Sequence, residues 1–531
     1  MKSATPHHNR SGAVNPLTLL VALAFLALVA AGWMMLRLGE TGRQSIQANQ
    51  NGSDAEPLVV YCAAGIRPPT AAVAKDYQQK FGVQIQLQYG GSNTLLSQIE
   101  ASETGDLFIA ADDSYIHLGR EKQLVAEAIP LAHQELIIAV TKGNPKGISS
   151  IDDLLKGDIT TAIGNPEQAA IGKVARRWLT KSGHWDRLSK QVTQTGVFKP
   201  TVPEVANDVI IGTIDAGIIW DATAVAHVDK LEMIRVPELS AGKAKISVGV
   251  LTSSQQPARA LHFARYLAAS DRGLLAFESK GFAIVEGDQW ADVPEMVFYC
   301  GSVNRRAVEP IINRFEQREG VSITTVYNGC GILSGQMQAI ADGDMPDSFP
   351  DVYLACDVHY LETVKDLFQD ATNISETEIV MVVQKGNPKN IQTLQDLTRD
   401  GIRVAVGQPK QCTIGVLTKN VLDEAGLYNE VMKNVVTETA TSALLLGTVT
   451  TESADVALAY KCDTQFEADR LDVVAIDSPA AKAVQPFGIA KSSAQKQLSR
   501  RLFNTVAQSQ AAFEDAGFAW RLETKTLTGT K

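Results

Sequence analysis

The sequence lacks an excess of positive charge. Its 49 Lys and Arg residues are outnumbered by 59 Asp and Glu residues, so the formal net charge at pH 7 is −10. A nucleic-acid partner needs a basic surface, and this balance argues against one. It does not argue against a small anion, because helix N-termini and clustered backbone N–H groups bind anions without any net positive charge.

Familiar catalytic motifs are also lacking. The sequence contains no Walker A loop, no H-E-x-x-H and no G-x-S-x-G motif, and its eight histidines are scattered. The aspartate pairs at 112–113 and 152–153 fit turns and helix caps better than a shared acid–base site. We therefore expect a binding protein rather than an enzyme.

One long apolar run lies near the N-terminus, at residues 17–36, after a tail at 1–16. The run contains no charged residue and is long enough to cross a bilayer as a helix. Its end, Trp33-Met34-Met35, fits the small-residue cleavage site of a signal peptide poorly. We expect an uncleaved, single-pass anchor in the cell membrane, with a cleaved signal as the alternative. In both cases the bulk of the chain is expected to be periplasmic or extracellular. Residues 37–56 are polar and are expected to form a flexible linker.

The rest of the chain repeats itself. A chain of 531 residues is too long for one hydrophobic core, and five short motifs recur in the same order about 240 residues apart. The first occurrences are at 58–62, 89–92, 106–112, 142–146 and 171–172, and the second are at 296–300, 327–330, 351–357, 385–389 and 414–415. This duplication predicts two solute-binding domains, at 57–290 and 295–524, followed by a C-terminal tail at 525–531.

Within each copy, strand patterns alternate with helix patterns. In the first copy, buried or half-buried strands are expected at 58–61, 84–88, 107–110 and 135–141, and helices at 70–81 and 95–99. This alternation predicts an α/β fold with parallel strands. Ligands of open α/β sheets bind at the carboxyl ends of the strands.

Five loops of the first copy follow predicted strands and are rich in small residues, which let a backbone approach a ligand closely. Each loop alone is weak evidence, because a Gly-Gly-Ser is usually a plain turn and a Trp at a strand end is usually part of the core. The five loops occur in the same order in both copies, and this repetition indicates that they form a ligand-binding site. The candidate ligand-binding residues are Ala64, Gly65, Ser92, Ala111, Ala169, Trp220 and Asp221.

The motifs YCAAG, YGGSN, GDLFIAADDSYI, KGNP, GNPEQAAIG and DAGIIWDA resemble those of the periplasmic molybdate/tungstate-type substrate-binding proteins of ABC importers. The resemblance covers nearly all of each copy. It implies tandem two-lobed domains of the type II periplasmic-binding fold, a small inorganic anion held between the lobes by hydroxyls and backbone N–H groups, and an importer permease as partner. The matching positions are Ala64, Ser92, Ala169 and Trp220. The family commonly has a serine in the first loop and a tyrosine at the position of Trp220, so two hydroxyls are missing here.

The second copy carries five of the six cysteines, each in a loop that matches a ligand loop of the first copy. They are Cys300, Cys330, Cys356, Cys412 and Cys462, of which Cys300 matches Cys62. None has C-x-x-C spacing. Three interpretations stay open: disulfides, a thiolate-bound metal ion or iron–sulfur cluster, and inert buried thiols. We expect all five to gather around one cleft.

These patterns together favour a membrane-anchored, extracytoplasmic solute-binding protein that captures a molybdate- or tungstate-like oxyanion for an ABC importer. One alternative is a ligand sensor or scaffold that does not transport. Another is a metal- or cluster-binding protein that uses the cysteines of the second copy.

Overall fold

The computed structural model describes residues 56–343 and 349–522. The expected N-terminal tail, the anchor, nearly all of the linker and the C-terminal tail lie outside these residues. Within the described ranges, no helix combines the length and the apolar character needed to cross a membrane.

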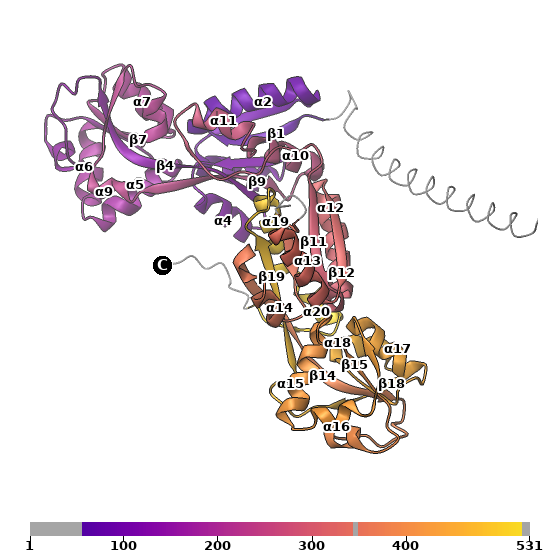
Figure 1. Ribbon diagram of the computed structural model, residues 1–531. Helices are drawn as coiled ribbons and strands as arrows, with labels where there is room; N and C mark the ends of the chain where they lie inside the picture. Colours follow the sequence, from indigo (N-terminus) through magenta and orange to yellow (C-terminus); the bar gives the residue numbers. More distant parts are fainter. Residues whose placement is uncertain (1–55, 344–348, 523–531) are drawn as a thin grey trace, which may run out of the picture. The chain divides into compact units, whose positions relative to one another are not determined.

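The first copy contains two sheets that share one long strand (Figure 1). The sheet of its first lobe has the order β2-β1-β3-β9-β4, with β10 added against β4. Strands β1, β2 and β3 are parallel, whereas β9 runs antiparallel to both β3 and β4. The strands are β1 (Leu58–Ala63), β2 (Ile85–Gly90), β3 (Leu107–Ala110), β4 (Val125–Thr141), β9 (Lys243–Leu251) and β10 (Ala283–Ile284). The helices of this lobe are α2 (Arg67–Phe81), α3 (Ser92–Ser102), α4 (Ser114–Glu121), α10 (Pro257–Leu267) and α11 (Gly273–Glu278).

The second lobe uses the C-terminal part of β4, which pairs there with β7 and β8. Its other strands extend the sheet in the order β4-β7-β5-β6. The strands are β5 (Thr161–Gly164), β6 (Val197–Lys199), β7 (Ala216–Trp220) and β8 (Leu231–Ile234). The helices are α5 (Ala170–Lys181), α6 (Trp185–Thr195), α7 (Val202–Ile210), α8 (Asp221–Val225) and α9 (Pro237–Ser240). Because β4 runs through both sheets, it ties the two lobes together.

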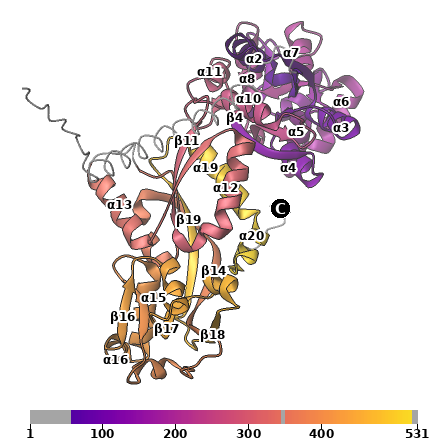
Figure 2. The same cartoon turned by 90° about the vertical axis from the view of Figure 1, so that its right-hand side faces the viewer.

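The second copy repeats this arrangement strand for strand, in the order β12-β11-β13-β19-β14-β17-β15-β16. Figure 2 shows its first lobe around β11 and β19 and its second lobe around β17 and β18. The strands are β11 (Glu295–Gly301), β12 (Ser322–Asn328), β13 (Val352–Leu354), β14 (Phe368–Gln384), β15 (Val404–Gly407), β16 (Val435–Thr439), β17 (Val456–Tyr460), β18 (Leu471–Ala475), β19 (Lys482–Ala490) and β20 (Ala519–Trp520). The helices are α12 (Arg305–Glu319), α13 (Cys330–Asp342), α14 (Val358–Glu362), α15 (Thr413–Glu424), α16 (Tyr428–Met432), α17 (Leu445–Thr450), α18 (Lys461–Thr464), α19 (Lys496–Ala507) and α20 (Gln510–Asp515).

The prediction of two tandem α/β domains is confirmed, because short apolar runs became buried central strands. Every residue of β3, β5 and β7 is buried, as expected for strands that are covered on both faces. The expectation of parallel strands holds only in part, because β4 and β9 run antiparallel to the strands beside them. The sequence predicted only 135–141 of β4, which in fact begins at Val125. Its first half contains Pro130 and two register shifts against β9, and such irregularities blur the alternation that marks a strand.

Candidate functional site

A pocket lies between the two lobes of the first copy. It has a cavity volume of about 20 Å³, roughly the room that one water molecule needs. Six of the predicted ligand-binding residues line it, and no lining side chain is charged. The lining residues are Ala63, Ala64, Gly65, Gly90, Gly91, Ser92, Ala111, Ala169, Ala170, Ile171, Thr201, Val202 and Trp220.

Asp221, the seventh predicted residue, is not in this lining. Its carboxylate accepts hydrogen bonds from the backbone N–H groups of Glu135, at 3.0 Å, and Ala222, at 2.8 Å. Burial raises the pKa of Asp221 above its usual value, and the two backbone N–H groups oppose that rise. The residue therefore joins β4 to the start of α8.

Three helices begin at the pocket wall, and their N-termini give the pocket a positive electrostatic potential. Helices α3, α5 and α7 follow the N-cap residues Gly91, Ala169 and Thr201, and none of these caps with a side-chain hydrogen bond. The first N–H groups of a helix have no partner within the helix, and the helix dipole is positive at that end. Convergent, uncapped N-termini make a site suited to an anion.

Ser92 supplies the hydroxyl of the pocket. Its side chain is 1% exposed, and its Oγ accepts a hydrogen bond from the backbone N–H of Ala111 at 3.2 Å. Trp220 closes the wall as the largest fully buried side chain of the described residues.

The lobes of the first copy meet directly beside the pocket. The backbone N–H of Asn93 donates to the carbonyl of Gln168 at 3.1 Å, and the Asn93 side-chain amide donates to the carbonyl of Glu167 at 2.7 Å. A Cβ on Gly91 would lie 2.3 Å from the Gln168 carbonyl oxygen. Only glycine allows this approach, so the structure shows a closed cleft.

The second copy is closed in the same way. The backbone N–H of Gly331 donates to the carbonyl of Gln411 at 3.1 Å, and the Tyr360 hydroxyl donates to the carbonyl of Pro409 at 2.6 Å. A Cβ on Gly329 would lie 2.4 Å from the Gln411 carbonyl oxygen.

Two cysteines come together in the second cleft. The sulfurs of Cys330 and Cys356 lie 2.6 Å apart, and the backbone N–H of Cys356 donates to the Cys330 sulfur at 3.0 Å. Burial alone would raise the pKa of Cys330, but hydrogen bonding from Cys356 and the nearby hydroxyls of Tyr353 and Thr413 bring it below its usual value. The pKa of Cys356 is raised well above its usual value by its hydrogen bond to Cys330 and by burial.

The other cysteines of the copy are buried but bond elsewhere. Cys412 is the N-cap residue of α15, and its thiol lies 3.5 Å from the carbonyl oxygens of Gln408 and Thr439. The Cys300 thiol faces the carbonyl of Gly301, and Cys462 donates its backbone N–H to the Thr377 hydroxyl. Across residues 56–343 and 349–522, no three His, Cys, Asp or Glu side chains are grouped as a metal ion requires.

Sequence reasoning missed a set of buried polar side chains in the second copy. Each has an oxygen with no hydrogen bond of normal geometry, and each replaces an apolar or small residue of the first copy. They are Asn304, Tyr353, Thr413, Ser442 and Tyr460, at the positions of Ile66, Phe108, Ala170, Val202 and Trp220. Buried oxygens without partners are costly. A comparison of the two copies position by position would have found these residues, whereas the search for cysteines did not.

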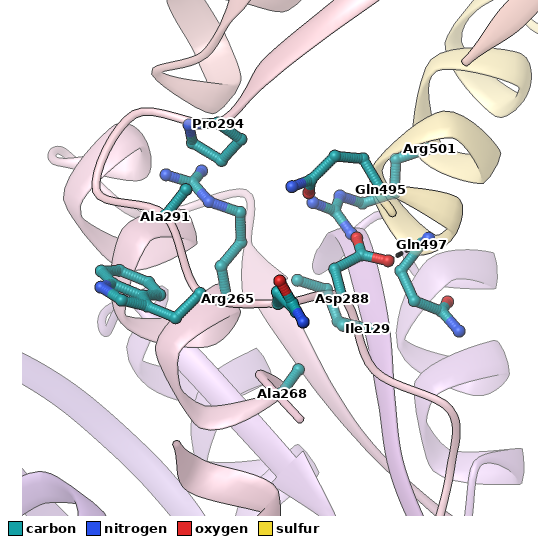
Figure 3. A pocket seen from close by; sticks show the side chains of 11 residues that line it. Ile129, Arg265, Ala268, Asp288, Ala291, Pro294, Gln495, Gln497 and Arg501 are labelled. Atoms are coloured by element: carbon teal, nitrogen blue, oxygen red, sulfur yellow. Dashed lines mark hydrogen bonds between the residues drawn. The ribbon is translucent and has the colours of Figure 1, made fainter. Parts of the chain in front are cut away.

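A second pocket lies beside the segment that joins the copies (Figure 3), and two of its charged side chains, Asp288 and Arg501, are already paired. Asp288 accepts hydrogen bonds from the backbone N–H groups of Gln497 and Leu498, at 2.8 and 2.9 Å. Nearby, Arg501 makes two hydrogen bonds to the carboxylate of Glu319, and Arg265 lies 3.6 Å from it. These pairings indicate that Asp288 and Arg501 have a structural role.

Both copies match one family of known proteins. The family model described as "Bacterial extracellular solute-binding protein" matches residues 58–283 and again 296–519. The molybdate-binding protein ModA of Mycobacterium tuberculosis is 27% identical over 233 residues, which is 43% of this chain and 85% of that protein. ModA of Escherichia coli is 26% identical over 231 residues, 42% of this chain and 88% of that protein. The periplasmic molybdate-binding protein of Azotobacter vinelandii aligns with 43% of this chain and 100% of its own, at 18% identity and a TM-score of 0.38.

Proposed function

The chain belongs to the family of bacterial extracellular solute-binding proteins, with two copies in tandem, and we propose that its first copy captures a small tetrahedral oxyanion for an ABC importer. The observation that carries this proposal is the convergence of α3, α5 and α7 on one pocket, without side-chain caps. Apart from the N–H of Asn93, which donates to the Gln168 carbonyl, their N-terminal N–H groups offer an anion preorganised donors.

The uncharged lining supports an oxyanion of the molybdate or tungstate kind. Neutral donors can surround such an ion without a buried ion pair, whose desolvation is costly. Ser92 adds one hydroxyl donor from the start of α3. Relatives named for molybdate binding match over nearly their whole length.

Delivery to a permease and anchoring at the membrane complete the proposal. The apolar run at 17–36 is long enough to hold the chain at a membrane surface, where an importer permease would receive the ligand. A sensor or scaffold would use the same clamp, and only the permease partner distinguishes these roles.

A thiolate-bound metal ion or iron–sulfur cluster in the second copy is the second candidate function. The observation that favours it is the contact between the Cys330 and Cys356 sulfurs in the cleft. Soft metal ions prefer thiolate ligands, and binding would depend on deprotonation of both thiols.

Calorimetric titration tests the proposed function. The purified chain is titrated with molybdate, tungstate, sulfate and phosphate, and we expect saturable heat with at least one of them. The absence of heat with all four would reject the oxyanion assignment. Elemental analysis of the same anaerobically purified sample decides whether the second copy holds a metal.

A further inference from the structure

The sulfurs of Cys330 and Cys356 are closer than two unbonded sulfur atoms in ordinary contact. Their separation is 2.6 Å, and a disulfide bond measures about 2.05 Å. Both side chains are buried, with 0% and 3% exposure. We propose that Cys330 and Cys356 are a redox pair that interconverts between dithiol and disulfide, and that the clamp of the second copy controls its access to oxidants.

The backbone already holds the two positions together without the sulfurs. In the first copy the equivalent residues are Ser92 and Ala111, and the Ala111 N–H donates to the Ser92 hydroxyl oxygen at 3.2 Å. In the second copy the Cys356 N–H donates to the Cys330 sulfur at 3.0 Å. The shared frame therefore brings the side chains into contact in both copies, and only the second copy places a thiol at each position.

The two thiols have different surroundings, which assigns their roles. Cys330 is the first residue of the 13-residue helix α13, and a helix N-terminus stabilises a thiolate. Cys356 follows β13 and lies outside the next helix, the five-residue α14, whose N-terminus is already capped by the side chain of Asp357. Cys330 is thus the attacking sulfur, and Cys356 the resolving one.

The oxidant is a disulfide, either a small one such as oxidised glutathione or that of an oxidoreductase. The Cys330 thiolate attacks one of its sulfurs, which forms a mixed disulfide and releases one thiol. Cys356 then attacks the Cys330 sulfur and releases the second thiol. The protons of Cys330 and Cys356 pass to the two released thiols, so the pair loses two electrons and the reagent gains two.

The closed cleft shields this pair. The N-cap residue of α13, Gly329, lies against the carbonyl oxygens of Gln411 and Ala440 from the other lobe. The Tyr360–Pro409 hydrogen bond crosses the same interface. A disulfide reagent is too large to pass these contacts, so the lobes must separate before exchange, and the rate of oxidation reports how often the clamp opens.

Thiol counting tests the redox pair. The full chain has six cysteines, all free and buried in the structure. After full reduction and exposure to oxidised glutathione, we expect alkylation under denaturing conditions to find four thiols, and peptide mass spectrometry to find Cys330 joined to Cys356. The variants C330S and C356A carry the residues of the first copy. C330S lacks the attacking sulfur and should keep all of its five thiols, whereas C356A lacks the resolving sulfur and should keep four, with one glutathione bound to Cys330. The control C462A, which also takes the first copy's residue, should lose two of its five thiols on oxidation. Six remaining thiols, a link between other cysteines, or a bound metal that protects both sulfurs would overturn the pair.

A matched pair of glycine variants tests the control by the clamp. In G329A, the added Cβ would lie 2.4 and 2.6 Å from the carbonyl oxygens of Gln411 and Ala440 and would hold the second cleft open. In G91A, it would lie 2.3 and 2.8 Å from those of Gln168 and Pro200 and would open the first cleft. We expect oxidation of the pair to be severalfold faster in G329A and unchanged in G91A. Y360F, which removes one hydrogen bond across the cleft, should change the rate in the same direction as G329A. Equal rates in all four proteins would overturn the control by the clamp.

Discussion

The Ser92 hydroxyl oxygen accepts a hydrogen bond from the backbone N–H of Ala111 at 3.2 Å. A hydroxyl that accepts one hydrogen bond still has its own proton to donate. Since Ser92 lines the pocket of the first copy, that proton is available to an anion between the lobes.

Replacement of Ser92 by alanine is therefore expected to weaken oxyanion binding. A hydrogen bond to a charged group contributes about 1.5–3 kcal/mol, which corresponds to roughly a 10- to 150-fold rise in Kd. Calorimetry of S92A with the anion that gives heat in the unaltered protein measures this effect. The exposed Ser279, whose hydroxyl donates to the carbonyl of Ala276, provides the control variant S279A. Equal affinities of S92A and S279A would remove Ser92 from the site.

Neutralisation of Glu319 is expected to destabilise the fold. Its carboxylate is 1% exposed and lies against Arg501 and Arg265. E319Q leaves two buried guanidinium groups without their counter-ion, a change that costs about 3–5 kcal/mol. The control E309Q alters a solvent-exposed ion pair with Arg305, which is worth at most about 1 kcal/mol. Urea unfolding compares the two, and similar midpoints would contradict the stabilising role of Glu319.

His262 should make stability depend on pH. Burial and the nearby Arg265 lower the pKa of His262 from 6.5 to about 4, and its ring nitrogens bond to Tyr77 and Asp292 at 2.6 and 2.9 Å. Above pH 6.5 the imidazole is neutral in both the folded and the unfolded chain. Between pH 6.5 and 4 only the unfolded chain takes up the proton, so stability falls by about 1.4 kcal/mol per pH unit. Tm measured from pH 7 to 4.5 should fall less steeply in H262Q, and identical slopes would refute this assignment.

Removal of the N-terminal region should release the chain from membranes. The full chain is expected to fractionate with membranes, and a chain that begins at Glu56 is expected to remain in the supernatant, because 17–36 is the apolar run long enough to span a bilayer. Sedimentation and immunoblotting distinguish the two. Expression of the full chain that yields protein in the supernatant, with a mature N-terminus near residue 36, would favour a cleaved signal instead.

The fold could be predicted because its strands are apolar runs between small-residue loops, and because the same order of motifs occurs in both halves of the sequence. The first half of β4 escaped prediction, since Pro130 and the register shifts break its alternation. The pocket residues followed from the rule that loops at strand ends meet. That rule could not predict that Cys330 contacts Cys356 while Cys462 bonds elsewhere. The order of the loops does not determine which side chains face each other. The unpartnered oxygens of Tyr353 and Tyr460 escaped for the same reason.

Native mass spectrometry with tungstate, on two matched variants, tests the central claim most directly. Ala169 and Cys412 are the N-cap residues of α5 and α15 at equivalent positions of the two copies, and aspartate is a good N-cap residue at either. The new carboxylate would occupy the helix N-terminus and repel an anion there. We predict that one bound tungstate is lost in A169D and retained in C412D. Tungstate binding that persists in A169D would contradict the assignment of the first copy as the oxyanion site.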